Sequence, residues 1–226
     1  MIKKIKFELT ILLLLVLNII ASSRFDITLH NFIKTNLYDE SSVKIVFLRE
    51  FFRRITEIGD SIWFFIISFF VFCVSYLLRK RATKHWRYYY NKFKEASLFL
   101  FVLILVSGLL TQIIKHVVGR PRPNHNSEKF FLDFNLFSFD SAFHSFPSGH
   151  TSTIFAVALF FSIFTPKIKY FYFLFAVIVS ISRIAVGAHY FTDIVGGIAI
   201  SFIGFKFTLF LFNKFKTSDH LVEIKN

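Results

Sequence analysis

The 226-residue chain is poor in several residue types that would mark other classes of protein. Its single cysteine, Cys73, excludes an intramolecular disulfide framework. It has only eight glycines and four prolines, and it carries 14 acidic against 27 basic residues. Apolar residues are abundant instead: 54% of the chain is hydrophobic, and 35 residues are phenylalanine. A water-soluble domain of this length needs more polar surface, so the composition favours a membrane protein.

The scarcity of glycine and proline leaves few residues that would end helices or mark loops. There is no internal repeat, low-complexity tract or linker, and we predict a single domain over residues 1–226. The formal net charge of +13 is compatible with nucleic-acid binding. In a membrane protein, however, basic residues collect on cytoplasmic loops because they set the orientation of the spans. We therefore expect no nucleic-acid partner.

Six apolar runs approach the length of about 20 residues that a membrane-spanning helix needs. We predict an all-α membrane bundle with six transmembrane helices. The predicted spans are residues 7–22, 61–78, 96–117, 151–164, 170–186 and 191–212. A further segment, 43–59, combines helical apolar spacing with charged residues, which is typical of an interfacial helix.

The first predicted span has two interpretations. The stretch MIKKIKFELTILLLLVLNIIASS resembles a secretory signal peptide, with a basic start and an apolar middle. No A-x-A-like cleavage site follows it, which favours a retained anchor. Under both interpretations the chain after Ser23 begins outside the membrane.

Basic residues give the spans a direction. They gather at the amino terminus, in the segment 78–95, in PKIK (166–169) and after the sixth span, and such segments are typically cytoplasmic. Both termini are then inside, and residues 23–60, 118–150 and 187–190 are outside. The bias toward Lys, Ile, Asn and Phe is typical of an AT-rich bacterial genome. We predict a multi-pass protein of the bacterial cytoplasmic (inner) membrane.

Charged side chains from three distant segments meet at the outer face in this topology. Lys115 and Arg122 follow the third span, and Arg183 ends the fifth, where a charge usually faces a partner or a wet cavity. Taken singly, each is also explained by anchoring or snorkelling to lipid headgroups. Together, three cations with only Asp193 as a nearby acid favour an anionic ligand. Phosphate suits the planar fork of Arg and the point charge of Lys.

The motif PSGH (147–150) opens the fourth span at the same face. The first amides of a helix have no intrahelical acceptor, and with the helix dipole they form a seat for phosphate. Gly149 lets the ligand approach the backbone, and Ser148 offers a hydroxyl. Taken alone, PSGH is also explained as an ordinary helix start.

His189 and Asp193 are four residues apart at the start of the sixth span, so the carboxylate can hold one imidazole nitrogen and leave the other nucleophilic. An isolated pair of this kind is more often structural, but this one faces three cations. His150 supplies a second imidazole, suited to protonating a leaving group. The remaining histidines show no zinc-site spacing, and we expect no metal or other cofactor. Tyr190 either lines the site or belongs to the interfacial aromatic belt, and the belt is the favoured interpretation.

Three motifs in order carry a family resemblance: KHVVGRPRP (115–123), PSGH and SRIAVGAHYFTD (182–193). Together they resemble the type 2 phosphatidic acid phosphatase superfamily, which includes bacterial membrane lipid phosphatases. The spacing Lys-x6-Arg-Pro selects Arg122; Arg120 also precedes a proline but does not fit the spacing. The soluble haloperoxidase branch of the superfamily is disfavoured by the predicted spans.

The resemblance implies a role for each matched position. His189 is the implied nucleophile that forms a phosphohistidine, Asp193 orients it, and His150 protonates the leaving oxygen. The implied phosphate-binding residues are Lys115, Arg122, Ser148, Gly149 and Arg183. No metal is implied.

The substrate expected from this resemblance is a membrane lipid phosphate or diphosphate: undecaprenyl diphosphate, phosphatidylglycerophosphate or lipid A 1-phosphate. The loop 118–146 is expected to shape the entrance and to influence that choice. Two other classes remain open, a non-catalytic protein that binds or moves anionic lipids and a structural bundle whose cations anchor to headgroups. Catalysis is favoured because binding alone has no need of a His/Asp pair.

Overall fold

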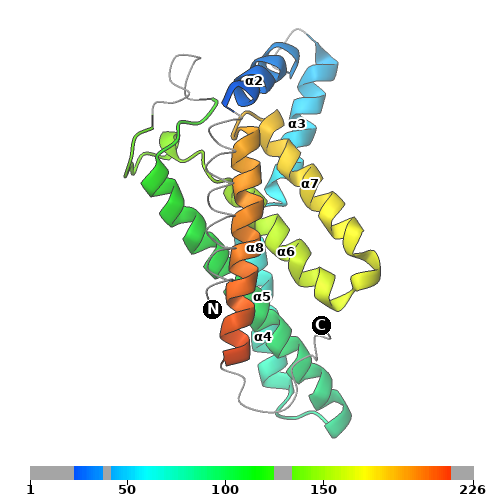
Figure 1. Ribbon diagram of the computed structural model, residues 1–226. Coiled ribbons are helices and arrows are strands. Elements are labelled where there is room, and N and C mark those ends of the chain that lie inside the picture. Colours follow the sequence, from blue (N-terminus) through cyan, green and yellow to red (C-terminus); the bar gives the residue numbers. More distant parts are fainter. Residues whose placement is uncertain (1–22, 38–41, 125–133, 215–226) are drawn as a thin grey trace.

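Figure 1 shows the protein in a computed structural model, which describes residues 23–37, 42–124 and 134–214. Within these ranges the regular structure is helical and contains no strand. The α-helices are α2 (Ser23–Leu37), α3 (Val43–Glu57), α4 (Ser61–Leu78), α5 (Lys84–Val118), α6 (Gly149–Phe164), α7 (Lys169–Ala185) and α8 (Phe191–Lys214). Two short 3₁₀ turns, η1 (Ser141–Phe143) and η2 (Pro166–Ile168), interrupt the connections. The all-α prediction is confirmed.

Four helical segments of the described chain are long and apolar enough to cross a membrane: Val43–Leu78, Lys84–Val118, Pro166–Ala185 and Phe191–Lys214. The apolar α6 is shorter, with 16 residues. The predicted first span, 7–22, lies outside the described residues. The number of six spans therefore stays a prediction.

Several predicted boundaries agree with the helices, but the start of α5 and the presence of α2 differ from the prediction. α4 begins and ends where the span 61–78 was expected. α5 begins at Lys84 instead of residue 96, because no proline, and no glycine before Gly108, interrupts the basic segment that precedes the apolar run. The helix α2 was not expected at all. It lies within residues 23–60, the segment predicted to lie outside the membrane.

The centre of the bundle is formed by α5, α6 and α8, with α4 packed on α5 and α7 on α6. Figure 1 shows α8 running through the middle of the molecule. Small residues allow α8 to approach its neighbours closely, as is common between membrane helices. A Cβ at Gly197 would lie 2.6 Å from the carbonyl oxygen of Ser148, and one at Gly204 would collide with Oγ of Ser107.

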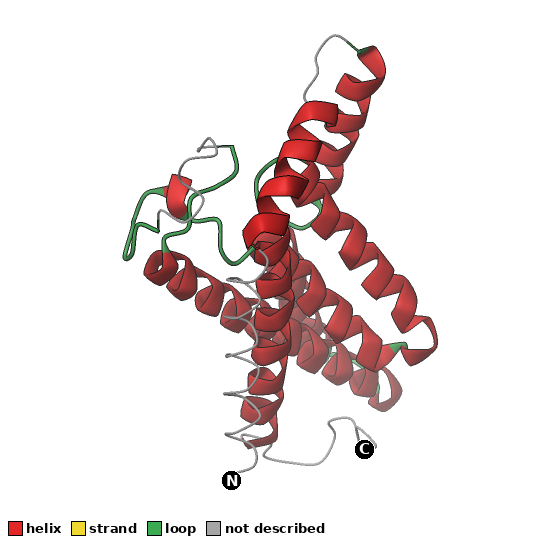
Figure 2. Cartoon of the chain, turned by 45° about the horizontal axis from the view of Figure 1, so that its top comes forward, coloured by secondary structure: helices red, strands yellow, loops and turns green. Residues whose placement is uncertain are grey.

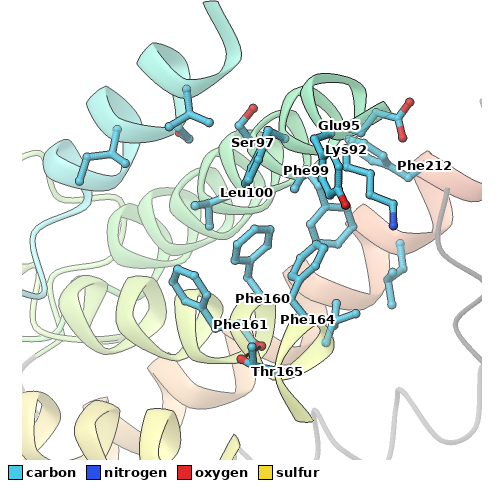
Figure 3. Close-up of a pocket in the computed structure, with 18 of the residues that line it drawn as sticks. Lys92, Glu95, Ser97, Phe99, Leu100, Phe160, Phe161, Phe164, Thr165 and Phe212 are labelled. Atoms are coloured by element: carbon cyan, nitrogen blue, oxygen red, sulfur yellow. Dashed lines mark hydrogen bonds between the residues drawn. The ribbon is translucent and has the colours of Figure 1, made fainter. Parts of the chain in front are cut away.

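The two ends of the bundle differ in character. At one end, α2, α3 and the irregular segments around η1 gather where α6 and α8 begin (Figures 1 and 2). At the other end, α4, α5, α6 and α8, with Tyr172 of α7, line a partly open apolar pocket of about 620 Å³ (Figure 3). Phenylalanines such as Phe99, Phe160 and Phe212 line the pocket, and Lys92 and Glu95 lie among its polar members. The predicted site residues belong to the first end.

Candidate active site

The end of α5 and the segment before α6 are joined by main-chain hydrogen bonds. Gly119 caps α5 in the left-handed conformation, with φ of 57°, and a Cβ there would collide with the carbonyl oxygen of Asn135. The amide of Asn135 donates to the carbonyl of Gly119 at 2.8 Å, and the amide of Arg122 donates to Ala142 at 2.8 Å. These bonds fix the backbone that carries Arg122. Residues 125–133 of the predicted entrance loop lie outside the described part of the chain.

The N-terminus of α6 is capped by Ser148 and tied to α8. The Oγ atom of Ser148 accepts hydrogen bonds from the amide and the hydroxyl of Thr151, at 3.5 and 3.1 Å. Its own amide donates to the carbonyl oxygen of Asp193 at 3.0 Å. The Ser148 hydroxyl retains a proton to donate, and the amides of Gly149 and His150 open the helix without a preceding intrahelical acceptor. The PSGH motif thus opens a helix, as expected from the sequence, and the helix begins at Gly149.

His189 and Asp193 face each other at the start of α8. The Nδ1 atom of His189 lies 3.6 Å from Oδ2 of Asp193, longer than a hydrogen bond but close enough for the carboxylate to orient the ring. The two side chains are 2% and 0% exposed. Because Nδ1 faces the carboxylate, Nε2 is the ring nitrogen directed away from it.

Asp193 is held by three further groups. Its Oδ2 atom accepts hydrogen bonds from Oγ of Ser145 at 2.6 Å and from the amide of Tyr190 at 2.8 Å. Its Oδ1 atom pairs with Nη1 of Arg120 at 2.5 Å. Arg120 and Ser145 were not assigned to the site from the sequence, although both lie within or beside its motifs.

The three predicted cations gather near the start of α6. Nζ of Lys115 donates to the carbonyl of His144 at 2.5 Å, and Nη1 of Arg183 donates to Oγ1 of Thr56 at 2.8 Å. Lys115 and Arg183 both lie within electrostatic range of Arg122. Within the described residues none of the three forms an ion pair with a carboxylate, and Nε of both arginines is buried without a hydrogen-bond partner. This excess of positive charge favours an anion.

His150 lies on the partly exposed side of the same cluster. Its electrostatic neighbours include Arg183, Lys115 and Arg122. The turn between α3 and α4 packs against its ring, since a Cβ at Gly59 would lie 3.1 Å from Cβ of His150 and 3.3 Å from Cδ2. Together with the contacts above, this places all eight predicted site residues at one end of the bundle.

Burial controls the charge state of the groups in the loops of the site. It lowers the pKa of His189 from 6.5 to about 3; the nearby cation Lys115 acts in the same direction and Asp193 opposes it. The ring is therefore neutral near pH 7, the form with a lone pair to share. Burial also lowers the pKa of the Arg122 guanidinium, with Asp193 again opposing. An anion beside Arg122 would oppose that shift in the same way.

Comparisons with known proteins identify the family to which the chain belongs. A sequence model of the PAP2 superfamily matches residues 96–217, which is more than half of the 226-residue chain. The chain belongs to this superfamily. The resemblance to type 2 phosphatidic acid phosphatases expected from the three motifs is thereby confirmed. The matched range of the PAP2 protein includes all eight predicted site residues but neither α2 nor α3.

Two curated relatives of this PAP2 protein are bacterial lipid phosphatases. It is 34% identical over 155 residues to the lipid A 1-phosphatase of Rhizobium etli, a match of 67% of this chain and 66% of the relative. It is 32% identical over 125 residues to the lipid A 4′-phosphatase of Porphyromonas gingivalis, a match of 51% of this chain and 52% of the relative. The chain spans about two thirds and about half of the length of these relatives.

A solved structure supports the fold of the PAP2 protein. The crystal structure of a transmembrane PAP2 type phosphatidylglycerolphosphate phosphatase from Bacillus subtilis matches with a TM-score of 0.61 and 21% sequence identity. The match covers 93% of this chain and 98% of the other. At this level of identity the likeness shows only that the two proteins share an arrangement of helices.

Two features of the PAP2 site differ from the sequence-based interpretation. Tyr190 is 5% exposed and lies under Arg120, whose Cζ is 4.5 Å from the ring centroid, so its assignment to the aromatic belt was wrong. Arg120 itself is buried, although the motif spacing passed it over. The pattern GRPRP offered a weak signal, because it places a second arginine two residues before the selected one. The partners of Arg120, which are Asp26, Thr192 and Asp193, lie too far along the chain for any spacing rule to indicate them.

No group of three or more His, Cys, Asp and Glu side chains among the described residues is arranged to hold a metal ion. Within the site the two histidines are instead accompanied by lysine and arginine side chains, which repel cations. The residues therefore fit an anionic ligand better than a metal.

Proposed function

We propose that this protein is an integral-membrane lipid phosphatase that acts through a phosphohistidine on His189. The observation that carries the proposal is the meeting of a buried, neutral His189 with three cations that have no carboxylate partner in the described chain. Binding an anion accounts for the cations, and a nucleophile accounts for the oriented imidazole.

In the first proposed step, Nε2 of His189 attacks the phosphorus atom of the lipid phosphate. A nitrogen–phosphorus bond forms as the bond from phosphorus to the lipid oxygen breaks. His150, which is protonated when the phosphate anion offsets the cations around its ring, gives a proton to that oxygen. The negative charge of the pentacoordinate state is met by Lys115, Arg122 and Arg183, with the amides at the start of α6 and the Ser148 hydroxyl. Asp193 stabilises the positive charge that develops on the nucleophilic ring.

In the second step, water attacks the phosphohistidine from the opposite side to the ring. His150, which lost its proton in the first step, accepts one from the water. The nitrogen–phosphorus bond breaks, inorganic phosphate leaves, and both histidines return to their starting states. No metal takes part in this proposed mechanism.

The substrate that we favour is lipid A 1-phosphate, and phosphatidylglycerophosphate and undecaprenyl diphosphate are the other candidates. The sequence similarity to lipid A phosphatases supports the first choice. The likeness to a phosphatidylglycerolphosphate phosphatase extends to the fold alone. We further propose that the site faces the extracytoplasmic side of the inner membrane, as the basic cytoplasmic segments predict.

Phosphate release by the purified protein from the three lipids in mixed micelles tests the proposal. We expect turnover that is highest for lipid A 1-phosphate, is abolished in His189→Ala and falls about a thousandfold or more in Asp193→Asn. Protein denatured in alkaline detergent, in which a nitrogen–phosphorus bond survives, should carry labelled phosphate on His189 when the substrate is labelled. Wild-type turnover by His189→Ala would overturn the mechanism, and tight binding of all three lipids without turnover would favour a lipid-binding protein.

A further inference from the structure

The helix α2 lies against the loop that carries His189. The ring of Phe25 packs edge-on against Phe191 at 5.4 Å between centroids, and His30 packs edge-on against Tyr190 at 6.0 Å. Figure 1 shows α2 at the end of the bundle where α8 begins. On this inner side of α2 lies Asp26, which is only 1% exposed. A buried carboxylate is costly unless it is paired and hydrogen-bonded, so its partners identify its role.

Both carboxylate oxygens of Asp26 are engaged with the site. Oδ2 pairs with Nη2 of Arg120 at 2.9 Å and also accepts a hydrogen bond from the hydroxyl of Thr192. Oδ1 accepts from the amide of Thr192 at 3.1 Å. Asp26 thus contacts the first turn of α8, one residue before Asp193, and a guanidinium that reaches Asp193 itself.

Arg120 bridges the two carboxylates with the two ends of one planar group. Nη2 faces Asp26, whereas Nη1 donates to Oδ1 of Asp193 at 2.5 Å and to Oγ1 of Thr192 at 2.6 Å. The Tyr190 ring covers one face of the guanidinium. Arginine has a rigid fork, so fixing Nη2 also fixes the direction from which Nη1 meets Asp193.

We propose that Asp26 is a positioning residue for phosphoryl transfer, which holds Arg120 so that Asp193 orients His189. This inference rests on the proposed function. Asp26 contacts neither His189 nor the cation cluster in any hydrogen bond or ion pair of the described chain, and it acts through Arg120 and Thr192. It lies outside the residues matched by the superfamily model, 96–217, so α2 contributes to the site from beyond that core.

The first test is Asp26→Asn, which removes the charge and keeps the size of the side chain. We expect kcat for lipid phosphate to fall about ten- to a hundredfold, the range seen when a group that orients a reactive residue is lost, with KM within about twofold. KM stays because the cations that hold phosphate are not disturbed. The matched control is Glu50→Gln on α3, whose carboxylate is 44% exposed and pairs with surface arginines. We expect wild-type kinetics in the control.

A double-mutant cycle separates positioning from loss of folded protein. Asp193→Asn removes the group through which Asp26 acts, so adding Asp26→Asn should lower kcat by less than about twofold. A merely structural role would make the two losses multiply. A tenfold further loss in the double variant would overturn the proposal.

Thr192 gives a second route if Asp26→Asn yields too little folded protein. Thr192→Val keeps the shape but removes the hydroxyl between Asp26 and Arg120, and Thr192→Ser restores it. We expect Thr192→Val to lower kcat at an unchanged KM and Thr192→Ser to recover most of it; equal rates in the two variants would contradict the proposal. If His189→Ala is inactive while Asp26→Asn and Thr192→Val keep full kcat, only this inference fails. Full activity of His189→Ala would instead remove the proposed function.

Discussion

Thr56 of α3 accepts a hydrogen bond of 2.8 Å from Nη1 of Arg183, although 127 positions separate the two residues in the chain. The contact fixes the direction of one of the three site cations from an element outside the matched superfamily region. Thr56 is buried, with 7% of its side chain exposed, so water does not readily replace its hydroxyl. The N-terminal helices therefore help to shape the end of the bundle that holds the candidate site.

Replacing Thr56 by valine should weaken phosphate binding. The isosteric change leaves Arg183 without its fixed acceptor, and a hydrogen bond to a charged group is worth about 1.5–3 kcal/mol. We expect the inhibition constant of inorganic phosphate and the KM for lipid phosphate to rise about tenfold. Thr56→Ser retains the hydroxyl and serves as control. Identical inhibition constants for the valine and serine variants would show that the hydroxyl does not position Arg183.

The imidazole of His189 should stay neutral over the working pH range. Burial lowers its pKa from 6.5 to about 3, so the ring stays neutral when the pH is lowered from 8 to 4.5. Nitrogen-15 NMR of histidine-labelled protein, with His189→Gln to assign the signal, measures this directly. We expect no titration of that signal between pH 4.5 and 8. A midpoint near 6.5 would contradict the buried, neutral nucleophile.

Two glycine-to-alanine changes in membrane helices should differ in their effect on stability and activity. A Cβ at Gly197 would lie 2.6 Å from the carbonyl oxygen of Ser148 and 2.9 Å from Cβ of Thr151, so it separates α8 from the start of α6. We expect Gly197→Ala to lower both the thermal midpoint and kcat, since overpacking costs about 1–3 kcal/mol. Gly108→Ala is the matched control, because a Cβ there meets nothing within 4 Å. Equal midpoints in the two variants would contradict the close packing.

Chelators should have little effect on turnover. The proposed mechanism uses a nitrogen nucleophile and protein cations, so it requires no divalent ion. We expect phosphate release to remain within about twofold of its starting rate after treatment with EDTA and removal of the chelator. A loss of activity that added zinc, magnesium or manganese restores would replace the proposed mechanism with a metal-dependent one.

The sequence was most informative where the signal is local. Apolar length placed α4, and the spacing of four between His189 and Asp193 placed both residues at one helix start. The PSGH motif was expected to open a helix, and α6 begins at its Gly149. Pairings between distant segments were out of reach, because Asp26 and Arg120 are 94 positions apart and each has an ordinary local context.

The same limit explains the misplaced Tyr190 and the unexpected α2. An aromatic residue near a membrane surface fits the interfacial belt in most proteins, and only its packing under Arg120 shows otherwise. The segment that forms α2 mixes polar and apolar residues without a long apolar run. Its helix is stabilised by contacts with α3, α7 and α8 that no pattern within the segment indicates.

The described part of the segment between α5 and α6 is held by main-chain hydrogen bonds, from Asn135 to Gly119 and from Arg122 to Ala142. Its large apolar side chains point outward instead, with Leu136, Phe137 and Phe139 exposed by 62%, 69% and 87%. Substitutions at these three positions can therefore change the outer surface of the segment without altering the main-chain hydrogen bonds that hold it. In the proposed lipid phosphatase, substitutions at these exposed positions can alter which lipid is accepted while the residues proposed to contact phosphate stay the same.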